Sequence, residues 1–289
     1  MTVDVAAAVI LRADGAFLLA RRPPGKVYAG WWEFTRGKVE SGEPAAGALA
    51  RELVEELGIV VRTAFPWITR VFTYEHATVR LHFFRVTAWD GEPQPREGQA
   101  FAWQRFGETM VEPMLPANAP VLKSLSLPHE YAIAGPGITP EQVEARFLGG
   151  LRLLRLRGAA NSGRIVELAR PHGARVLGAA GAGMDGVHYT AAELAALAAR
   201  PQGLCAASCH TRAELERAMA LDMDFAVVGP VKPTATHPGA VALGWEAFAA
   251  IVRDSAIPVY AIGGMRREDL AQAWATGAHG VAMIRGSWD

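Results

Sequence analysis

Residues 37–59 form the segment of this 289-residue chain that most restricts local structure. They read GKVESGEPAAGALARELVEELGI, which contains the pattern G-x5-E-x7-R-E-U-x-E-E-x-G-U, where U is an apolar residue. Residues 45–57 are rich in Ala, Leu and Glu, which are good helix formers. An acidic residue and a proline precede this stretch and Gly58 follows it, so the sequence predicts a helix that stops at Gly58.

Three carboxylates lie on one edge of this predicted helix. Glu52 and Glu56 are four residues apart and Glu52 and Glu55 three apart, so their side chains are neighbours. Like charges so placed repel, and a hard divalent cation such as Mg²⁺, which takes oxygen ligands, would offset the repulsion. The alternative is a solvated acidic helix end on which Arg51 pairs with neighbouring carboxylates. The apolar side chains of another face should pack inward: Ala48, Leu49 and Leu53.

The composition excludes several classes of partner. With 29 basic and 29 acidic side chains and a formal net charge of zero, the chain lacks a polybasic field for polymeric nucleic acid. It has no charged leader and no apolar run of 18 residues, so we expect a cytoplasmic protein that contacts no membrane. Cys205 and Cys209 are expected to be small buried residues around a strand in a reducing compartment. A small anionic substrate fits this composition better than a polymer.

The first part of the chain is expected to form a mixed sheet covered by helices. Strands are predicted over 3–11, 16–20, 69–74, 79–89 and 102–106, the first two joined by a turn at 13–15. A closing helix is predicted over 116–126. Together these elements predict a domain over residues 1–127.

From about residue 128, short apolar strands alternate with helices. The predicted strands cover 131–135, 151–157, 175–180, 186–189, 204–208, 225–229, 259–263 and 281–284. Eight such units are typical of a parallel barrel. Only a few residues separate the third and fourth strands, so one crossover helix should be missing. The sequence therefore predicts an α/β chain whose second domain, residues 128–289, is a reduced TIM-type (β/α)8 barrel.

The pattern over 37–59 matches the Nudix box at every fixed position, and residues 3–126 resemble a MutT-type Nudix hydrolase. This family cleaves a nucleoside diphosphate linked to another group. The resemblance implies an α/β/α sandwich, a small nucleotide substrate, and Mg²⁺ as cofactor with Mn²⁺ as the alternative. The implied metal ligands are Gly37, Glu52, Glu55, Glu56 and Glu97, and the four glutamates are also the implied catalytic residues.

The resemblance also implies four substrate-binding residues. Arg22 would reach the base or the phosphates, and Lys38 would contact the substrate beside it. Phe34 would stack on the base, and Asn118 would read the purine edge of oxidised guanine. The alternatives are a surface cation for Arg22, a core aromatic for Phe34 and a helix N-cap for Asn118.

One departure from the family pattern lies just before the box. The family usually reads Trp-Glu-Phe-Pro-Gly-Gly-Lys, and here Thr35 and Arg36 replace the proline and the first glycine. Because a residue with a Cβ resists positive φ, we expect the loop to differ locally. Arg36 could alternatively add a phosphate contact.

Residues 129–289 resemble the thiamine phosphate synthase and TenI superfamily. The resemblance rests on DGVH at 185–188, SCHT at 208–211, GPVKPTATHPG at 229–239 and AIGG at 261–264. It implies a phosphorylated thiamine-related ligand in the barrel. The implied phosphate-binding positions, which act through backbone amides, are Gly263, Gly264, Arg285 and Gly286.

The residues that synthase chemistry needs are largely replaced. The family's Gln-x-Arg-x-Lys strand reads RLRGA at 155–159, so only the arginine at 157 is kept. The Asn-Asp pair that holds Mg²⁺ on the pyrophosphate falls at Gly178 and Ala179, and the lysine after Pro-Thr-x-Thr is His237. A synthase must neutralise a departing pyrophosphate, so we expect a degenerate barrel without synthase activity.

The leading hypothesis is a Mg²⁺-dependent nucleoside triphosphate pyrophosphohydrolase of the 8-oxo-dGTP diphosphatase type, which sanitises the nucleotide pool and so supports DNA repair. A second hypothesis is hydrolysis of a thiamine-type diphosphate, which only the fused barrel suggests. A third is a barrel that senses a phosphorylated ligand and regulates the hydrolase.

Overall fold

The computed structural model describes residues 2–75, 77–108, 110–158, 161–180, 183–234, 239 and 241–289. Contacts within the chain divide it into two compact units, Met1–Ser126 and Leu127–Asp289. Within the described ranges, no helix is both long and apolar enough to cross a lipid bilayer.

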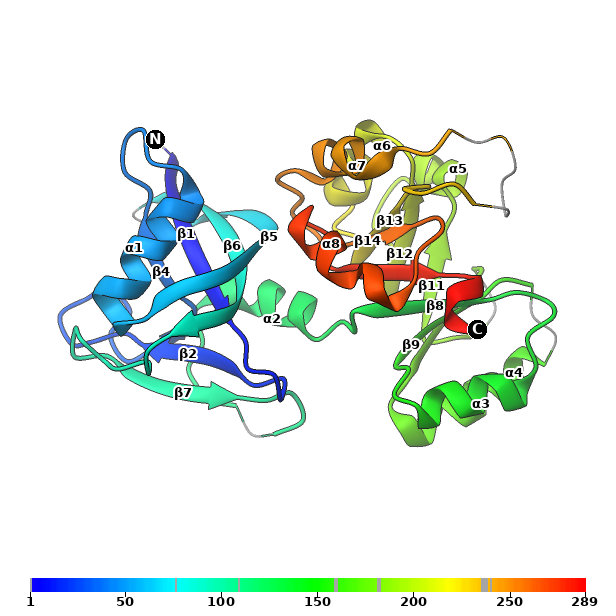
Figure 1. Cartoon of the computed structure of the whole chain (residues 1–289), viewed down its shortest axis with the longest axis horizontal. Helices are drawn as coiled ribbons and strands as arrows, with labels where there is room; N and C mark the ends of the chain where they lie inside the picture. The colour runs from blue at the N-terminus through cyan, green and yellow to red at the C-terminus, as the bar shows by residue number, and fades with distance from the viewer. Residues whose placement is uncertain are drawn as a thin grey trace. The chain divides into compact units, whose positions relative to one another are not determined.

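The first unit contains two β-sheets and is shown at the blue end of Figure 1. The strand order is β4-β1-β6-β5 in the larger sheet and β3-β2-β7 in the smaller. In the larger sheet β1 pairs parallel with β6 and antiparallel with β4, which confirms the predicted mixed sheet. The elements are β1 (Thr2–Ile10), β2 (Phe17–Arg21), β3 (Trp32–Glu33), β4 (Thr35–Lys38), α1 (Ala45–Leu57), β5 (Val60–Thr73), β6 (Thr78–Asp90), β7 (Ala100–Gln104), a 3-10 helix (Pro116–Asn118) and α2 (Ala119–Leu125).

Strands β1 and β2 do not form the hairpin that the turn at residues 13–15 suggested. In the described residues they share only an isolated bridge between Leu11 and Phe17. The hairpin is excluded because both edges of β1 are occupied, by β4 on one side and β6 on the other. Its alternate side chains enter two different hydrophobic clusters, so β1 is buried on both faces like a central strand.

Helix α1 forms where the box predicted it. It begins at Ala45 and ends at Leu57, and the next residue, Gly58, has a φ of 70° that provides the left-handed conformation of the C-cap. The inward face lies over β1 and β4 (Figure 1) and packs with Ala6, Ala8 and Ile10 of β1. The predicted buried residues Ala48, Leu49 and Leu53 are confirmed, and Leu57 joins them.

The second unit is a closed eight-stranded barrel in the order β10-β11-β12-β13-β14-β15-β8-β9, as predicted. All neighbouring strands pair in parallel. Its elements are β8 (Glu130–Ala134), α3 (Pro140–Leu148), β9 (Leu153–Leu156), α4 (Ser162–Ala169), β10 (Arg175–Gly178), β11 (Gly186–Tyr189), α5 (Ala191–Ala196), β12 (Leu204–Cys209), α6 (Arg212–Ala220), β13 (Phe225–Val228), α7 (Gly244–Val252), β14 (Val259–Ile262), α8 (Leu270–Ala275) and β15 (Gly280–Met283), with 3-10 helices at Arg170–His172, Arg267–Asp269 and Arg285–Ser287.

No helix joins β10 to β11 in the described part of that connection, in agreement with the short spacing in the sequence. Cys205 and Cys209 are buried in β12 as small core residues. The barrel interior is filled by large side chains that include Tyr131, Phe225 and Tyr260. Because side chains alternate along a strand, the next inward positions, such as Ile133 on β8 and Arg155 on β9, lie nearer the carboxyl ends of the strands. Those ends are where barrels of this type carry their sites.

Candidate functional site

The carboxylates of the box gather at one cavity of the first unit. Glu52 and Glu56 on α1 and Glu97 from the loop before β7 line a cavity of about 580 Å³, together with Gly37 on β4. Glu55 does not line this cavity, and its side chain is 55% exposed. Four of the five predicted metal-site residues therefore line the same cavity, and Glu55 is not among its lining residues.

Gly37 allows the helix carboxylate to approach the strand backbone. A Cβ at this position would lie 1.8 Å from the Cδ atom of Glu52, so any larger residue would displace that side chain. Gly37 pairs with Ala6 of β1 and lies on the face of the sheet that α1 covers. The first glycine of the box thus places the Glu52 carboxylate against β4.

Arg51 holds the carboxylates around it. Its guanidinium donates to Glu43 Oε2 at 3.0 Å, to Glu52 Oε1 at 2.8 Å and to Glu55 Oε2 at 3.3 Å. It also donates to the Lys38 carbonyl at 3.0 Å, which ties α1 to the end of β4. Hydrogen bonds from Arg51 lower the pKa of Glu43. The structure therefore contains the ion pairs of Arg51 that the solvated-helix alternative predicts. Arg51 and Glu52 also line the cavity to which Glu56 and Glu97 contribute.

Glu56 is the most perturbed carboxyl group of the cavity. Burial, followed by the negative charges of Glu52, Glu97 and Glu33, raises the pKa of Glu56 to about 8. A nearby cation would stabilise the ionised form of a carboxyl group that is buried beside other carboxylates in this way.

The loop that carries Glu97 is anchored to the end of α1. The backbone N–H of Gln94 donates to the Leu57 carbonyl at 2.9 Å, and that of Arg96 to the Glu56 carbonyl at 3.2 Å. Gln99 Nε2 donates to the same Glu56 carbonyl at 2.9 Å, while Gln99 Oε1 accepts from the Glu97 N–H at 2.7 Å. Gln99, a buried residue two positions after Glu97, therefore positions that loop.

The donor set fits a hard divalent cation in its chemistry. Carboxylate oxygens and a backbone carbonyl are the ligands that Mg²⁺ and Mn²⁺ take, and repulsion among the glutamates favours a cation. In the described residues no group of three or more His, Cys, Asp or Glu side chains converges closely enough to hold a metal. Glu52 and Glu55 are instead engaged by Arg51.

A second cavity, of about 450 Å³, adjoins the first and shares Gly37, Lys38, Glu56 and Glu97 with it. Lys26 also lines both cavities, which sequence reasoning missed because a lone loop lysine carries no pattern. The lining of this second cavity also includes apolar side chains from both sheets and the loop before β6: Val3, Val5, Ala20, Ala77 and Val79.

Arg22 and Arg36 line the second cavity and share one carboxylate. Arg22 Nη1 is hydrogen-bonded to Glu33 Oε1, and Arg36 Nε donates to Glu33 Oε2 at 2.6 Å. Arg36 lies in β4 opposite Ala7 and is not among the residues with positive φ. The residue that replaces the family's first glycine is therefore accommodated in a regular strand without positive φ.

Phe34 and Asn118 lie apart from both cavities. Phe34 is 1% exposed, with its ring 6.2 Å from that of Phe17 and 6.0 Å from that of Phe83, as the core-aromatic alternative expects. Asn118 is 5% exposed, and its Nδ2 lies 3.5 Å from the Trp32 carbonyl. Asn118 occupies the N-cap position of α2, as the capping alternative expects, but its side chain makes no capping hydrogen bond to the helix.

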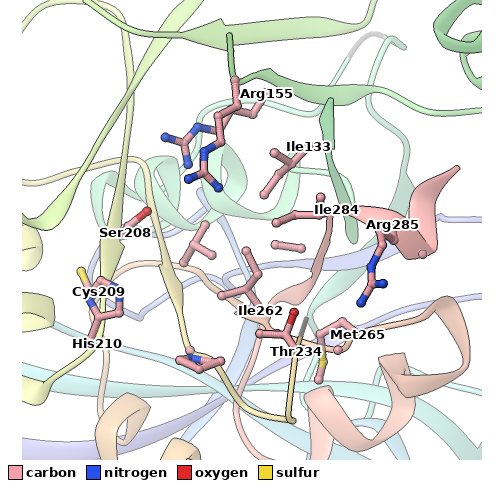
Figure 2. Close-up of a pocket in the computed structure, with 18 of the residues that line it drawn as sticks. Ile133, Arg155, Ser208, Cys209, His210, Thr234, Ile262, Met265, Ile284 and Arg285 are labelled. Atoms are coloured by element: carbon pink, nitrogen blue, oxygen red, sulfur yellow. The ribbon is translucent and has the colours of Figure 1, made fainter. Parts of the chain in front are cut away.

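The barrel carries a cavity of about 540 Å³ at the carboxyl ends of its strands (Figure 2). The two adjacent glycines after β14 have φ of 100° and 63°, and a Cβ on Gly263 would lie 2.6 Å from Pro230 Cβ. Only glycine fits this close approach between two loops. All four predicted phosphate-binding positions line the cavity: Gly263, Gly264, Arg285 and Gly286.

Several residues of the expected degenerate synthase site can be located. Gly178 is the buried last residue of β10, and Ala179 follows it in an exposed turn. Arg157 lines the cavity, as does Arg155, which stands at the family's glutamine position. Ala159 and His237 lie outside the described residues.

Sequence comparisons match each unit to a known family. The family described as NUDIX domain matches residues 1–125, and the family described as Thiamine monophosphate synthase matches residues 173–286. Over 122 residues the chain is 38% identical to a protein of Escherichia coli named CTP pyrophosphohydrolase, and the match covers 42% of this chain and 90% of that protein.

Two further relatives extend these matches. The chain is 37% identical over 123 residues to a Haemophilus influenzae protein named 8-oxo-dGTP diphosphatase, a match that covers 43% of this chain and 90% of the relative. It is 35% identical over 161 residues to a Geobacter sulfurreducens protein named Putative thiamine-phosphate synthase, with 49% of this chain and 76% of the relative covered.

Proposed function

Because the chain belongs to the Nudix hydrolase family through its first unit and to the thiamine monophosphate synthase family through its second, we propose that the first unit is a nucleoside triphosphate pyrophosphohydrolase. Its proposed substrate is 8-oxo-dGTP, since two relatives that are 37% and 33% identical over the first unit carry the name 8-oxo-dGTP diphosphatase. The products are the nucleoside monophosphate and pyrophosphate. A substrate drawn from the nucleotide pool supports a cytoplasmic location.

The observation that carries this proposal is the pair of adjoining cavities in the first unit. Glu52, Glu56 and Glu97 form the acidic end, and Lys26 and Lys38 supply cations where the two cavities meet. The apolar side chains of the lining suit a base, and the lysines suit the phosphates. A nucleotide that spans both cavities therefore presents its phosphates to the carboxylates.

The proposed chemistry is the attack of a water molecule on phosphorus. Glu52, Glu55, Glu56, Glu97 and the carbonyl of Gly37 are the proposed metal ligands. A divalent cation held there, Mg²⁺ in this proposal, would supply charge neutralisation at the phosphate oxygens and raise the acidity of the attacking water. A glutamate of the cluster accepts the proton of the attacking water, and Lys38 and Arg22 orient the phosphates.

Substrate profiling of the full chain tests this proposal. The assay would compare 8-oxo-dGTP, dGTP, CTP and thiamine diphosphate, each with Mg²⁺, Mn²⁺ or excess EDTA. We expect the highest kcat/KM for 8-oxo-dGTP and no turnover in EDTA. A preference for CTP would move the substrate to a pyrimidine nucleotide, a preference for thiamine diphosphate would favour the second hypothesis, and turnover without metal would refute the mechanism.

For the barrel we propose retention of phosphate binding without synthase activity. The described residues that line its cavity include one carboxylate, Asp289, and none at the position of the family's metal pair, where Gly178 and Ala179 stand. The loops at Gly263 and Gly286 do not depend on that pair. The test is an assay with the pyrimidine diphosphate, the thiazole phosphate and Mg²⁺, in which product formation would overturn this proposal.

A further inference from the structure

A guanidinium that has no counter-ion among the described residues projects into the barrel cavity. Arg155 lies on the inward face of β9 and is partly buried. It makes no hydrogen bond or ion pair with any residue that the structure describes, although Tyr131, Arg157 and Glu193 influence its charge. Burial is the largest of the effects that lower the pKa of Arg155. A partly desolvated cation of this kind is costly to the protein and is stabilised by an anion.

Beside Arg155, a hydrogen-bonded chain runs from the barrel interior to the cavity wall. The hydroxyl of Tyr131 lies 2.9 Å from His188 Nδ1, and His188 Nε2 lies 2.9 Å from Ser208 Oγ. Tyr131 and His188 are 0% and 2% exposed, whereas Ser208 lines the cavity. Burial and the charge of Arg155 lower the pKa of His188, so its ring is neutral and carries one N–H.

The direction of this chain follows from the tyrosine. His188 is the hydrogen-bond partner that the structure gives the Tyr131 hydroxyl, and a fully buried hydroxyl proton needs an acceptor. Tyr131 therefore donates to Nδ1, which places the imidazole proton on Nε2. The Nε2–H donates to Ser208 Oγ, and the proton of Ser208 is left to point toward an acceptor in the cavity.

The remaining lining of the cavity is also suited to an anion. Arg157, Arg266 and Arg285 add three cations, while Asp289 supplies the one lining carboxylate among the described residues. Figure 2 shows Arg155 on β9 and Arg285 on the 3-10 helix after β15 at the same cavity, which Ser208 also lines. An apolar portion lies between them and is formed by Ile133, Ile262 and Ile284.

We propose that Arg155 and Ser208 bind a phosphoryl dianion of a small molecule directly, without a divalent cation. The guanidinium provides paired N–H donors and the serine one more, which together suit the oxygens of a phosphate or diphosphate group. Arginine charge here replaces the metal that a carboxylate pair would have held. This inference extends the ligand-binding role proposed for the barrel and does not depend on hydrolysis by the first unit.

Calorimetric titration of the full chain with inorganic pyrophosphate and, separately, thiamine phosphate tests this inference in excess EDTA. We expect metal-free binding of at least one probe and a loss of affinity of at least about tenfold in Arg155→Gln. The matched control, Arg170→Gln, makes the same change at an exposed residue outside the cavity and should bind normally. The two probes distinguish inorganic diphosphate from an organic phosphate ester as the ligand.

Three results would overturn the inference: no binding of either probe, binding that requires Mg²⁺, or normal affinity in Arg155→Gln with an unchanged melting temperature. The synthase assay is separate, so turnover there would refute the inactive barrel without deciding how the anion is held.

A second measurement examines Ser208. The ¹⁵N shifts of His188 should show the Nε2–H tautomer, and Tyr131→Phe should weaken binding by a few fold. The opposite tautomer would show that Ser208 donates to the histidine and not to the ligand.

Discussion

The two units differ in the charged groups that line their cavities. In the first unit the carboxylates of Glu52, Glu56 and Glu97 gather at one cavity, beside Lys26, Lys38 and Arg51, whereas arginines dominate the charged lining in the second, including Arg155, Arg157 and Arg285. Both belong to families that act on phosphorylated small molecules. A phosphate can enter an acidic cavity only with a cation, whereas an arginine-lined cavity can bind it directly. The sign of the wall charge therefore predicts which unit needs a metal.

Each cavity also contains a charge that burial disfavours. The pKa of Glu56 is raised to about 8 by burial and by neighbouring carboxylates, and the pKa of Arg155 is lowered mainly by burial. In both cases a ligand of opposite charge would shift the pKa back toward its usual range. Perturbed groups in concave sites are frequently functional, which supports a role for both cavities.

The largest expected effect comes from neutralising the acidic wall. Glu52→Gln and Glu56→Gln should each reduce kcat for 8-oxo-dGTP hydrolysis by about a hundredfold or more, because each removes a charged group from the reacting end. Steady-state kinetics with Mg²⁺ would measure the loss. Glu92→Gln is the matched control, since Glu92 is exposed and lines neither cavity of the first unit. Near-normal turnover in both variants would refute the metal-site assignment.

A nearly equal effect is expected from a single methyl group on β4. Gly37→Ala would place a Cβ 1.8 Å from Glu52 Cδ, so the carboxylate must move out of the cavity. We expect kcat to fall by roughly a hundredfold, because a misplaced catalytic group costs about as much as a missing one. Gly47→Ala on α1 provides the comparison, since its added Cβ would come no closer than 3.4 Å to a neighbouring atom, an ordinary contact. Similar kinetics for the two alanine variants would show that Glu52 can relocate without loss.

Much of this architecture is readable from local patterns. The helix over 45–57 and the eight barrel strands were predictable because each has its own apolar period and its own stop signal, such as Gly58. The strands that pair with β1 were not predictable. The tight turn after β1 favours a hairpin with β2, whereas the observed pairing is with residues 35–38 and 78–86, which lie farther along the chain. Strand β5 was predicted only at its end, since its 14 residues lack a clean alternation of burial.

The candidate site residues divide in the same way into those that a local sequence pattern predicts and those that it does not. The box residues Gly37, Glu52 and Glu56 follow from spacing, because a helix fixes which side chains are neighbours. Lys26 and Gln99 do not follow from spacing, because they lie in loops, and the path of a loop is not predicted by a periodic sequence pattern. In the barrel, the unpaired state of Arg155 depends on the side chains of adjacent strands and is visible only once the barrel closes.

A smaller effect should come from Asn118, the residue predicted to read the base. Asn118→Ala should raise KM for 8-oxo-dGTP by roughly tenfold and KM for dGTP much less, since a lost polar contact to the oxidised edge costs discrimination. Its buried position beside Trp32 allows a different outcome. If both KM values change equally and the melting temperature falls, Asn118 supports the core and does not select the base.

The smallest expected effect concerns stability alone. Thr35 is 3% exposed on β4, and its Oγ1 has no hydrogen-bond partner among the described residues. Thr35→Val keeps the shape, removes the unpaired hydroxyl and adds a methyl group on the face that Ala8 and α1 share. Because an unsatisfied buried polar group costs about 1–3 kcal/mol, the free energy of unfolding should rise by about 1 kcal/mol.

Urea denaturation of the full chain would measure this gain, with Thr73→Val as the control. Thr73 is exposed at the end of β5, so its substitution should change the free energy of unfolding by no more than about 0.5 kcal/mol. Thr35 also lines the second cavity of the first unit, beside Gly37 and Glu56. A loss of stability in Thr35→Val would therefore mean that its hydroxyl is paired in solution, through water or a bound ion, and that the acidic cavity reaches deeper under β4 than its carboxylates indicate.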